Sequence, residues 1–270
     1  VYLPLIYRAR ACIVIETFFW LIYNKEENQK QFVLSVDEIG LETDPSSIEN
    51  LDNVWSESLL RWAACVRLLM DKNMDESAAE ALENHLIRMT RLASDETQIP
   101  KSMSIRIAIL VLQVKALRWC FDEEIERCLI GLETATEIEF SLVKDLDNPE
   151  IVYIRSAELF AFYLLVFHRS YSRVSSAYDL HYSSVPITDF PSIAFDLYEK
   201  TNRTAPYRGI NMLGMARAQA QMGHRAEASQ LYQRLLHNWS HSLFSSSIDQ
   251  IVIQEAIDYL RRNMPGYDYN

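Results

Sequence analysis

Apolar residues recur at helical spacing in nearly every part of the chain, and the helical segments come in pairs. A short polar turn joins the two members of each pair, which is typical of antiparallel helices packed as a hairpin. Only six glycines and eight prolines occur in 270 residues, too few for the many short strands of a sandwich or barrel. The sequence therefore predicts an all-α fold. Its helices pair over 54–70 and 75–92, 102–119 and 122–140, 154–167 and 171–182, and 206–222 and 225–239.

The last of these hairpins carries the most specific pattern. Its string LGMARAQAQMGHRAEASQLYQRLLHNW places small residues where the two helices approach closely, and Gln219 where an aromatic residue is usual. This pattern resembles the tetratricopeptide motif, which sets large, small and aromatic residues at fixed positions. The structural repeat positions are matched by Met215, Ala216, Gly223, Ala228, Tyr232 and Leu235.

Shorter pieces extend the resemblance over most of the chain. Together they resemble the C-terminal half of uncharacterised bacterial-type tetratricopeptide-repeat proteins. The pieces are RARACIVIETFFW at 8–20, WAACVRLLMDKNMDESAAEALENHLIRM at 62–89, LETATEIE at 132–139, AEL at 157–159 with LL at 164–165, and the last hairpin. The resemblance implies an α-solenoid, a right-handed superhelix of stacked antiparallel hairpins. It implies one helical-repeat domain over 1–270 that is part of a longer chain, and it transfers no catalytic residue.

The hairpins begin about 50 residues apart, more than the 34 residues of a compact tetratricopeptide repeat. Long connections are therefore expected. Two segments look irregular: an acidic loop near 24–53, and a linker near 183–192 that contains Pro186 and Pro191. Connections of this length are often functional.

Stacked hairpins of this kind expose a concave face that serves as an extended binding surface. Alignment of the last hairpin with the motif places Leu213, Arg217, Ala220 and Gln221 on that face. The set contains two apolar residues, one polar residue and one basic residue, so it is not a basic surface. It predicts a partner-binding surface for a protein or peptide segment, either extended or helical.

The formal net charge of −11 is concentrated toward the N-terminus. Residues 35–57 contain seven acidic residues and no lysine or arginine. Such a segment would repel a phosphate backbone, so no nucleic-acid partner is expected, whereas a protein partner with a basic region is. No apolar run reaches the roughly 18 to 20 residues that span a bilayer, so no membrane insertion is expected.

The sequence contains no recognisable catalytic constellation. His237 and His241 share a helix face but lack a third ligand, so no metal site is predicted. No phosphate loop, G-x-S-x-G string or catalytic-cysteine signature occurs. The cysteines show no C-x-x-C spacing and are expected to pack as small apolar residues. They are Cys12, Cys65, Cys120 and Cys128.

These observations favour a non-enzymatic scaffold that binds a protein or peptide and needs no cofactor. Two alternatives stay open at this point. The chain is the C-terminal helical half of a larger enzyme whose active residues lie upstream of Val1, or it assembles with itself through an end helix over 248–262.

Overall fold

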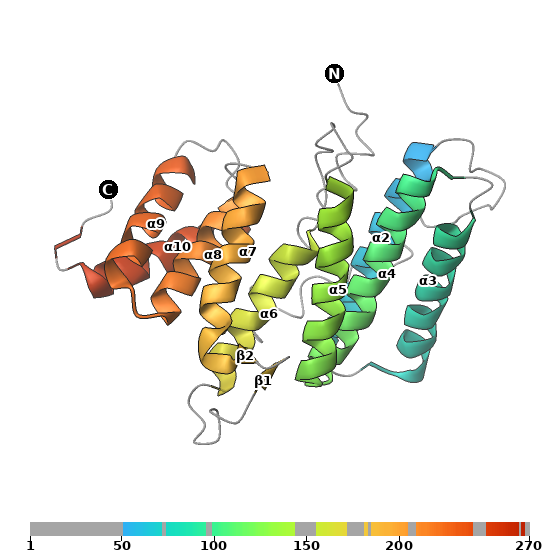
Figure 1. Cartoon of the computed structure of the whole chain (residues 1–270), viewed down its shortest axis with the longest axis horizontal. Helices are drawn as coiled ribbons and strands as arrows, with labels where there is room; N and C mark the ends of the chain where they lie inside the picture. The colour runs from blue at the N-terminus through green and yellow to red at the C-terminus, as the bar shows by residue number, and fades with distance from the viewer. Residues whose placement is uncertain are drawn as a thin grey trace. The chain divides into compact units, whose positions relative to one another are not determined.

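The computed structural model of the chain is shown in Figure 1. It describes residues 51–71, 74–95, 99–143, 155–171, 181–182, 185–204, 209–239, 247–264 and 266–267. The resembling piece at 8–20, Cys12, His241 and residues 24–50 of the acidic loop lie outside them. The chain divides into two compact units, Val1–Leu146 and Asp147–Asn270. The single repeat domain over 1–270 stays a prediction.

The first unit contains α2 (Leu51–Met70), α3 (Glu76–Ser94), α4 (Lys101–Phe121) and α5 (Ile125–Val143). Each helix packs on the next, and α4 also packs on α2. The helix α4 is the centre of this unit, because its buried residues surround most of its circumference. A helix covered on several sides has no single apolar stripe, which explains the even spread of its apolar residues.

Local sequence fixes where these helices begin. Asp75 is the N-cap of α3, and its carboxylate accepts a hydrogen bond of 2.8 Å from the backbone N–H of Ala78. This bond satisfies one of the donors that a helix start leaves unpaired. The hydroxyl of Ser104 donates to the carbonyl of Ala93, which ties the start of α4 to the end of α3.

The second unit contains α6 (Ser156–Tyr171), α7 (Phe190–Thr204), α8 (Gly209–Gln221), α9 (Arg225–Trp239) and α10 (Ser247–Asn263). Each of these helices packs on the next, and α8 also packs on α6. Every residue of α6 from Ser156 to Leu165 is buried. This helix therefore has the same kind of enclosed position in the second unit that α4 has in the first.

The predicted linker near 183–192 contains more structure than expected. The two-residue strands β1 (His181–Tyr182) and β2 (Val185–Pro186) pair antiparallel, the 3-10 turn η5 (Ile187–Asp189) follows, and α7 begins at Phe190. Pro191 indicated a loop in the sequence, but it lies in the first turn of α7, where proline's missing N–H costs nothing. The helix predicted over 171–182 is wrong at its end, because residues 181–182 form β1.

The all-α prediction is confirmed. The hairpins predicted over 54–92, 102–140 and 206–239 correspond to α2 with α3, α4 with α5, and α8 with α9. Within the part of the chain that the structure describes, the strands β1 and β2 are the only ones, and no helix is long and apolar enough to cross a membrane. The handedness of the predicted superhelix stays a prediction.

The turns of two hairpins are built alike. The backbone hydrogen bonds that close the turn between α4 and α5 have counterparts 100 residues later, in the turn between α8 and α9. The N–H of Glu124 donates to the carbonyl of Trp119, and the N–H of His224 donates to the carbonyl of Gln219. Both turns need one residue in the left-handed region, and this residue is Glu123 in the first (φ 59°) and Gly223 in the last. The hairpin of α4 and α5 therefore follows the same register as the last hairpin.

The helices approach closely where one of them carries a very small residue. A Cβ added at Gly131 would lie 2.8 Å from the Cβ of Ala116, which faces it across the hairpin of α4 and α5. A Cβ added at Gly214 would lie 2.3 Å from the ring of Tyr198, which packs from α7 onto α8. A larger residue at Gly131 would push α5 away from α4, and one at Gly214 would displace the buried ring of Tyr198.

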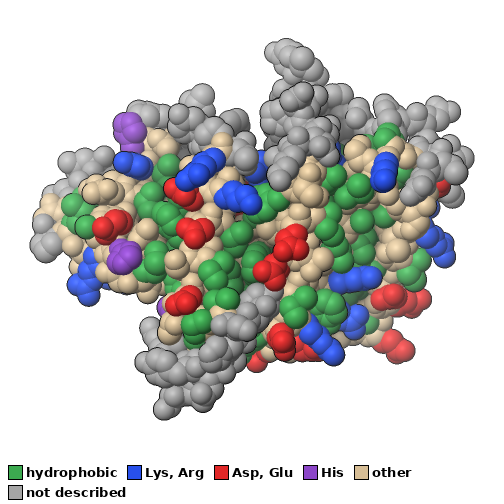
Figure 2. Space-filling view, viewed as in Figure 1, with side chains coloured by type: hydrophobic (Ala, Val, Ile, Leu, Met, Phe, Trp, Pro, Cys, Tyr) green, Lys and Arg blue, Asp and Glu red, His purple; other side chains and the backbone are tan. Residues whose placement is uncertain are grey.

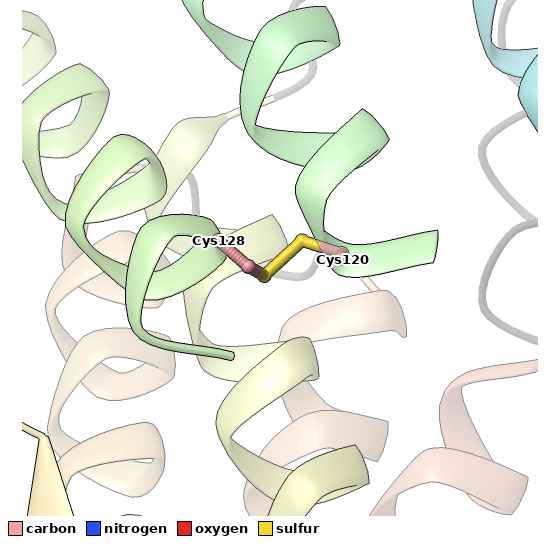
Figure 3. The surroundings of a disulfide bond; sticks show 2 residues. All are labelled: Cys120 and Cys128. Carbon is pink, nitrogen blue, oxygen red and sulfur yellow. A yellow bond between two sulfur atoms is a disulfide. The ribbon is translucent and has the colours of Figure 1, made fainter. Parts of the chain in front are cut away.

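Cys120 and Cys128 form a disulfide across the turn between α4 and α5 (Figure 3). The expectation that the cysteines pack only as small apolar residues is therefore wrong for this pair. It is confirmed for Cys65, which is buried as a free thiol. The turn brings two residues eight apart in sequence to a Cα separation of 4.8 Å, within the range that a disulfide spans. In the last hairpin the corresponding residues are Ala220 and Ala228.

Replacing Gly214 with alanine should destabilise the second unit, because the new methyl group would overlap the ring of Tyr198. We expect the free energy of unfolding to fall by about 1–3 kcal/mol, measured by urea unfolding followed by circular dichroism. In a Tyr198→Ala background the same replacement should be neutral or stabilising, since alanine favours a helix over glycine by about 1 kcal/mol. Equal losses in both backgrounds would contradict the close contact.

The double variant Cys120→Ala/Cys128→Ala should keep its helix content, because the last hairpin carries alanines at both places. Its free energy of unfolding should be lower by about 2 kcal/mol, since the unfolded chain is no longer restricted by the closed loop. A reducing agent should destabilise the wild-type chain by the same amount and leave the variant unchanged. Alkylation of both cysteines in the unfolded, unreduced wild-type chain would show that the bond is absent.

Candidate functional site

A groove with a volume of about 480 Å³ lies between α3 and α4. This volume is within the range of about 300 to 1,000 Å³ that is usual for ligand pockets. The floor is apolar: Leu82 and Leu86 come from α3 and Val114 from α4, and all three are buried. Residues four apart point to the same side of a helix, which is why Leu82 and Leu86 line the floor together.

Two further apolar side chains, Ile87 and Trp119, line the groove beside this floor. Ile87 follows Leu86 on α3 and is 41% exposed, so it is among the few large hydrophobic residues that the described surface presents to solvent. Trp119 lies near the end of α4 and is half-buried. A ligand that covers this exposed isoleucine would remove apolar surface from water, which favours binding.

The rim of the groove is basic. Arg91 from α3 and Lys115 and Arg118 from α4 line it and are exposed, and Glu83 is the only acidic residue in the lining. None of the three basic side chains forms an ion pair with any residue that the structure describes. Figure 2 shows hydrophobic side chains between charged ones over α3 and α4.

Behind the groove, a buried polar cluster holds α3 against α2. Arg61 on α2 donates from Nε to Oε1 of Glu57 at 2.8 Å, and Arg88 on α3 donates from Nε to the same oxygen at 3.3 Å. Arg61 also donates from Nη1 to Nδ1 of His85 at 3.1 Å. Glu57 belongs to the acidic segment 35–57, but its carboxylate is shared between two arginines and is not available to a basic partner.

The environment of His85 keeps its imidazole neutral. Burial, with the charge of Arg61 as a smaller cause, lowers the pKa of His85 from 6.5 to about 4. The neutral ring accepts at Nδ1 from the guanidinium of Arg61, and a protonated ring has no acceptor there. The hydrogen bond between α2 and α3 therefore depends on the neutral form.

Acidification should destabilise the first unit through His85. Below pH 6.5 the unfolded chain takes up a proton at this residue, whereas the folded chain does so only near pH 4. Because the unfolded state binds more protons in this window, the free energy of unfolding should fall by up to about 1.4 kcal/mol per pH unit. In His85→Asn the amide oxygen still accepts from Arg61 but does not titrate. Urea unfolding across this window should show a smaller pH dependence for the variant, and parallel curves would contradict the assignment.

The predicted partner-binding residues on α8 lie among other side chains of the second unit. Leu213 is 1% exposed and has no surface to offer a partner. Gln221 makes a hydrogen bond of 2.7 Å to His168 of α6, and Ala220 is half-buried. The alignment with the motif indicated a face of the helix, but it did not show that α6 and α10 contribute side chains there.

Arg217, the fourth of these residues, is held by α10. Its guanidinium donates two hydrogen bonds to the carboxylate of Glu255, at 2.8 and 2.6 Å, and the hydroxyl of Tyr232 donates to the same carboxylate at 3.1 Å. Burial alone would raise the pKa of Glu255, but these bonds and the charge of Arg217 outweigh it and lower the pKa. The group stabilises the packing of three helices.

The residues predicted as structural repeat positions lie on α8, on α9 and in the turn between them. Their side chains are buried in the hairpin interior, and Gly223 takes the left-handed conformation in the turn. The buried residues are Met215, Ala216, Ala228, Tyr232 and Leu235.

Among the described residues, no group of three histidine, cysteine or acidic side chains is arranged to hold a metal ion. His237 is exposed on α9. Cys65 is a poor nucleophile, because burial raises its pKa to about 12 despite the charge of Arg61. The residues that the sequence analysis missed are those of the groove between α3 and α4. The one local signal was Ile87, an isoleucine next to the buried stripe of an amphipathic helix.

Comparison of the chain with protein-family models, with curated proteins and with solved structures gives no match. The tetratricopeptide resemblance stays a prediction.

Proposed function

We propose that this chain is a non-enzymatic scaffold that binds a segment of another protein. The observation that carries the proposal is the groove between α3 and α4, where the exposed Ile87 borders an apolar floor. Grooves between paired helices bind peptide segments by taking their apolar side chains onto such a floor. Residues on the predicted face of α8 support the proposal less, because Arg217 and Gln221 are engaged with other helices.

A partner with a basic region was expected from the acidic segment 35–57. Most of that segment lies outside the described residues, so this expectation stays a prediction. The groove is a separate candidate surface with the opposite charge, since Arg91, Lys115 and Arg118 surround it. A scaffold with both surfaces would bind two different segments.

Selection from a displayed library of random peptides, about 15 residues long so that a helix can form, tests the function. With the whole chain immobilised, we expect enriched peptides whose binding is lost with Ile87→Ser. Ile130→Ser is the matched control, because Ile130 is 48% exposed on α5 and does not line the groove. Both replacements remove an exposed isoleucine from a helix, so they should change stability alike.

Two outcomes would overturn this function. If no peptide is enriched over a surface without protein, the scaffold proposal is wrong. If the enriched peptides bind Ile87→Ser as tightly as the wild-type chain, the groove is not the binding site. Circular dichroism of both variants shows whether each keeps its helices.

A further inference from the structure

We infer that the partner of the groove is an acidic amphipathic helix. This inference rests on the proposed function and adds to it the chemistry of the segment that binds. It follows from the length of the groove, from its apolar floor and from the three exposed basic side chains that line it.

The chain itself shows how a helix occupies such a site. In the first unit α4 packs against both α2 and α3, and in the second α8 packs against both α6 and α7. The pair α3 and α4 has α2 on one side, and the groove lies on the side that exposes Ile87 and Lys115. A further helix placed there would repeat the packing that the chain uses twice.

The lining has the length of a short helix. On α3 it runs from Leu82 to Arg91, which is about 14 Å at 1.5 Å per residue. A partner helix of that length has two to three turns and presents about three apolar side chains on one face. Those side chains would cover Ile87 and meet the apolar floor.

The charge of the partner follows from where three basic side chains gather. Some arginines of the described residues are paired with acids, as Arg127 is with Glu124, whereas Arg234 and Arg261 form no ion pair with a described residue. The three cations of the groove differ from the other unpaired ones in that they gather around one apolar floor. The chain has eleven more acidic than basic residues, yet Arg91, Lys115 and Arg118 form no ion pair with any of the described ones. Carboxylates flanking the apolar face of a partner would lie next to all three.

The acidic excess of the whole chain does not oppose this contact. At physiological ionic strength charges are screened beyond about 8 Å, so distant acids act weakly on the groove. Contacts at about 4 Å with the three rim cations are screened much less. An anionic membrane or a nucleic acid would be attracted by the same cations, but neither repeats the helix packing that the apolar floor offers.

Three designed peptides of about 15 residues test the inference. The first carries leucines on one helical face and glutamates beside them. Its basic twin has lysine for each glutamate, and its polar twin has serine for each leucine. Binding of the labelled peptides to the whole chain is measured by fluorescence anisotropy, with anionic vesicles and a single-stranded oligonucleotide as competitors.

We expect the acidic peptide to bind at least about 10-fold more tightly than either twin. The double variant Lys115→Glu/Arg118→Glu should bind the acidic peptide about 10-fold or more weakly than the wild-type chain does, and it should bind the basic twin more tightly. Arg234→Glu/Arg261→Glu is the matched control, because it changes the net charge equally at exposed positions outside the groove. It should change binding by less than about 2-fold.

The possible results distinguish a wrong partner class from a wrong function. Equal binding of the acidic peptide and its basic twin, equal loss in both charge variants, or displacement of the peptide by vesicles or the oligonucleotide would overturn the acidic helix. If the acidic peptide does not bind but library peptides still bind at Ile87, the partner class is wrong and the scaffold function stands. If neither binds, the function itself is wrong.

Discussion

At two places in the described part of the chain, neighbouring helices pack closely because one of them carries a glycine. Gly131 opposite Ala116 lets α5 approach α4, and Gly214 beneath the ring of Tyr198 lets α8 approach α7. Because the helices are this close, turns of a few residues suffice to join them, and the disulfide between Cys120 and Cys128 can bridge one of those turns. The packing of each unit follows from these approaches.

The groove is a consequence of the same packing. The helix α4 is enclosed because α2, α3 and α5 all pack on it, whereas α3 contacts α2 on one side and α4 on another. A helix with fewer neighbours keeps part of its surface in solvent, and on α3 that part includes Ile87. The hydrogen bonds of Arg61 to His85 and of Arg88 to Glu57 join α2 to α3 and hold α3 in this place.

The sequence predicted what depends on neighbouring residues and missed what depends on distant ones. Ala216, Gly223 and Ala228 lie within one hairpin, where both alanines are buried and the glycine is in the turn. The hairpin of α4 and α5 has the same register, but cysteines at the places of two alanines hid the likeness. Leu213 was assigned to a surface because the motif gives only a helix face. The groove combines residues from two hairpins and was not predictable from either alone.

Two sets of charges in the first unit affect its free energy very differently. Glu57 and Arg61 are buried, so removal of Glu57 would leave the buried charge of Arg61 uncompensated, at a cost of about 3–5 kcal/mol. Arg91, Lys115 and Arg118 are exposed, and an ion pair at such a position stabilises a fold by only about 0–1 kcal/mol. Folding therefore gives little reason for three cations to surround one apolar floor. In the complex that we propose, their arrangement would act when the partner covers the groove, because burial of its carboxylates beside them strengthens each charge contact.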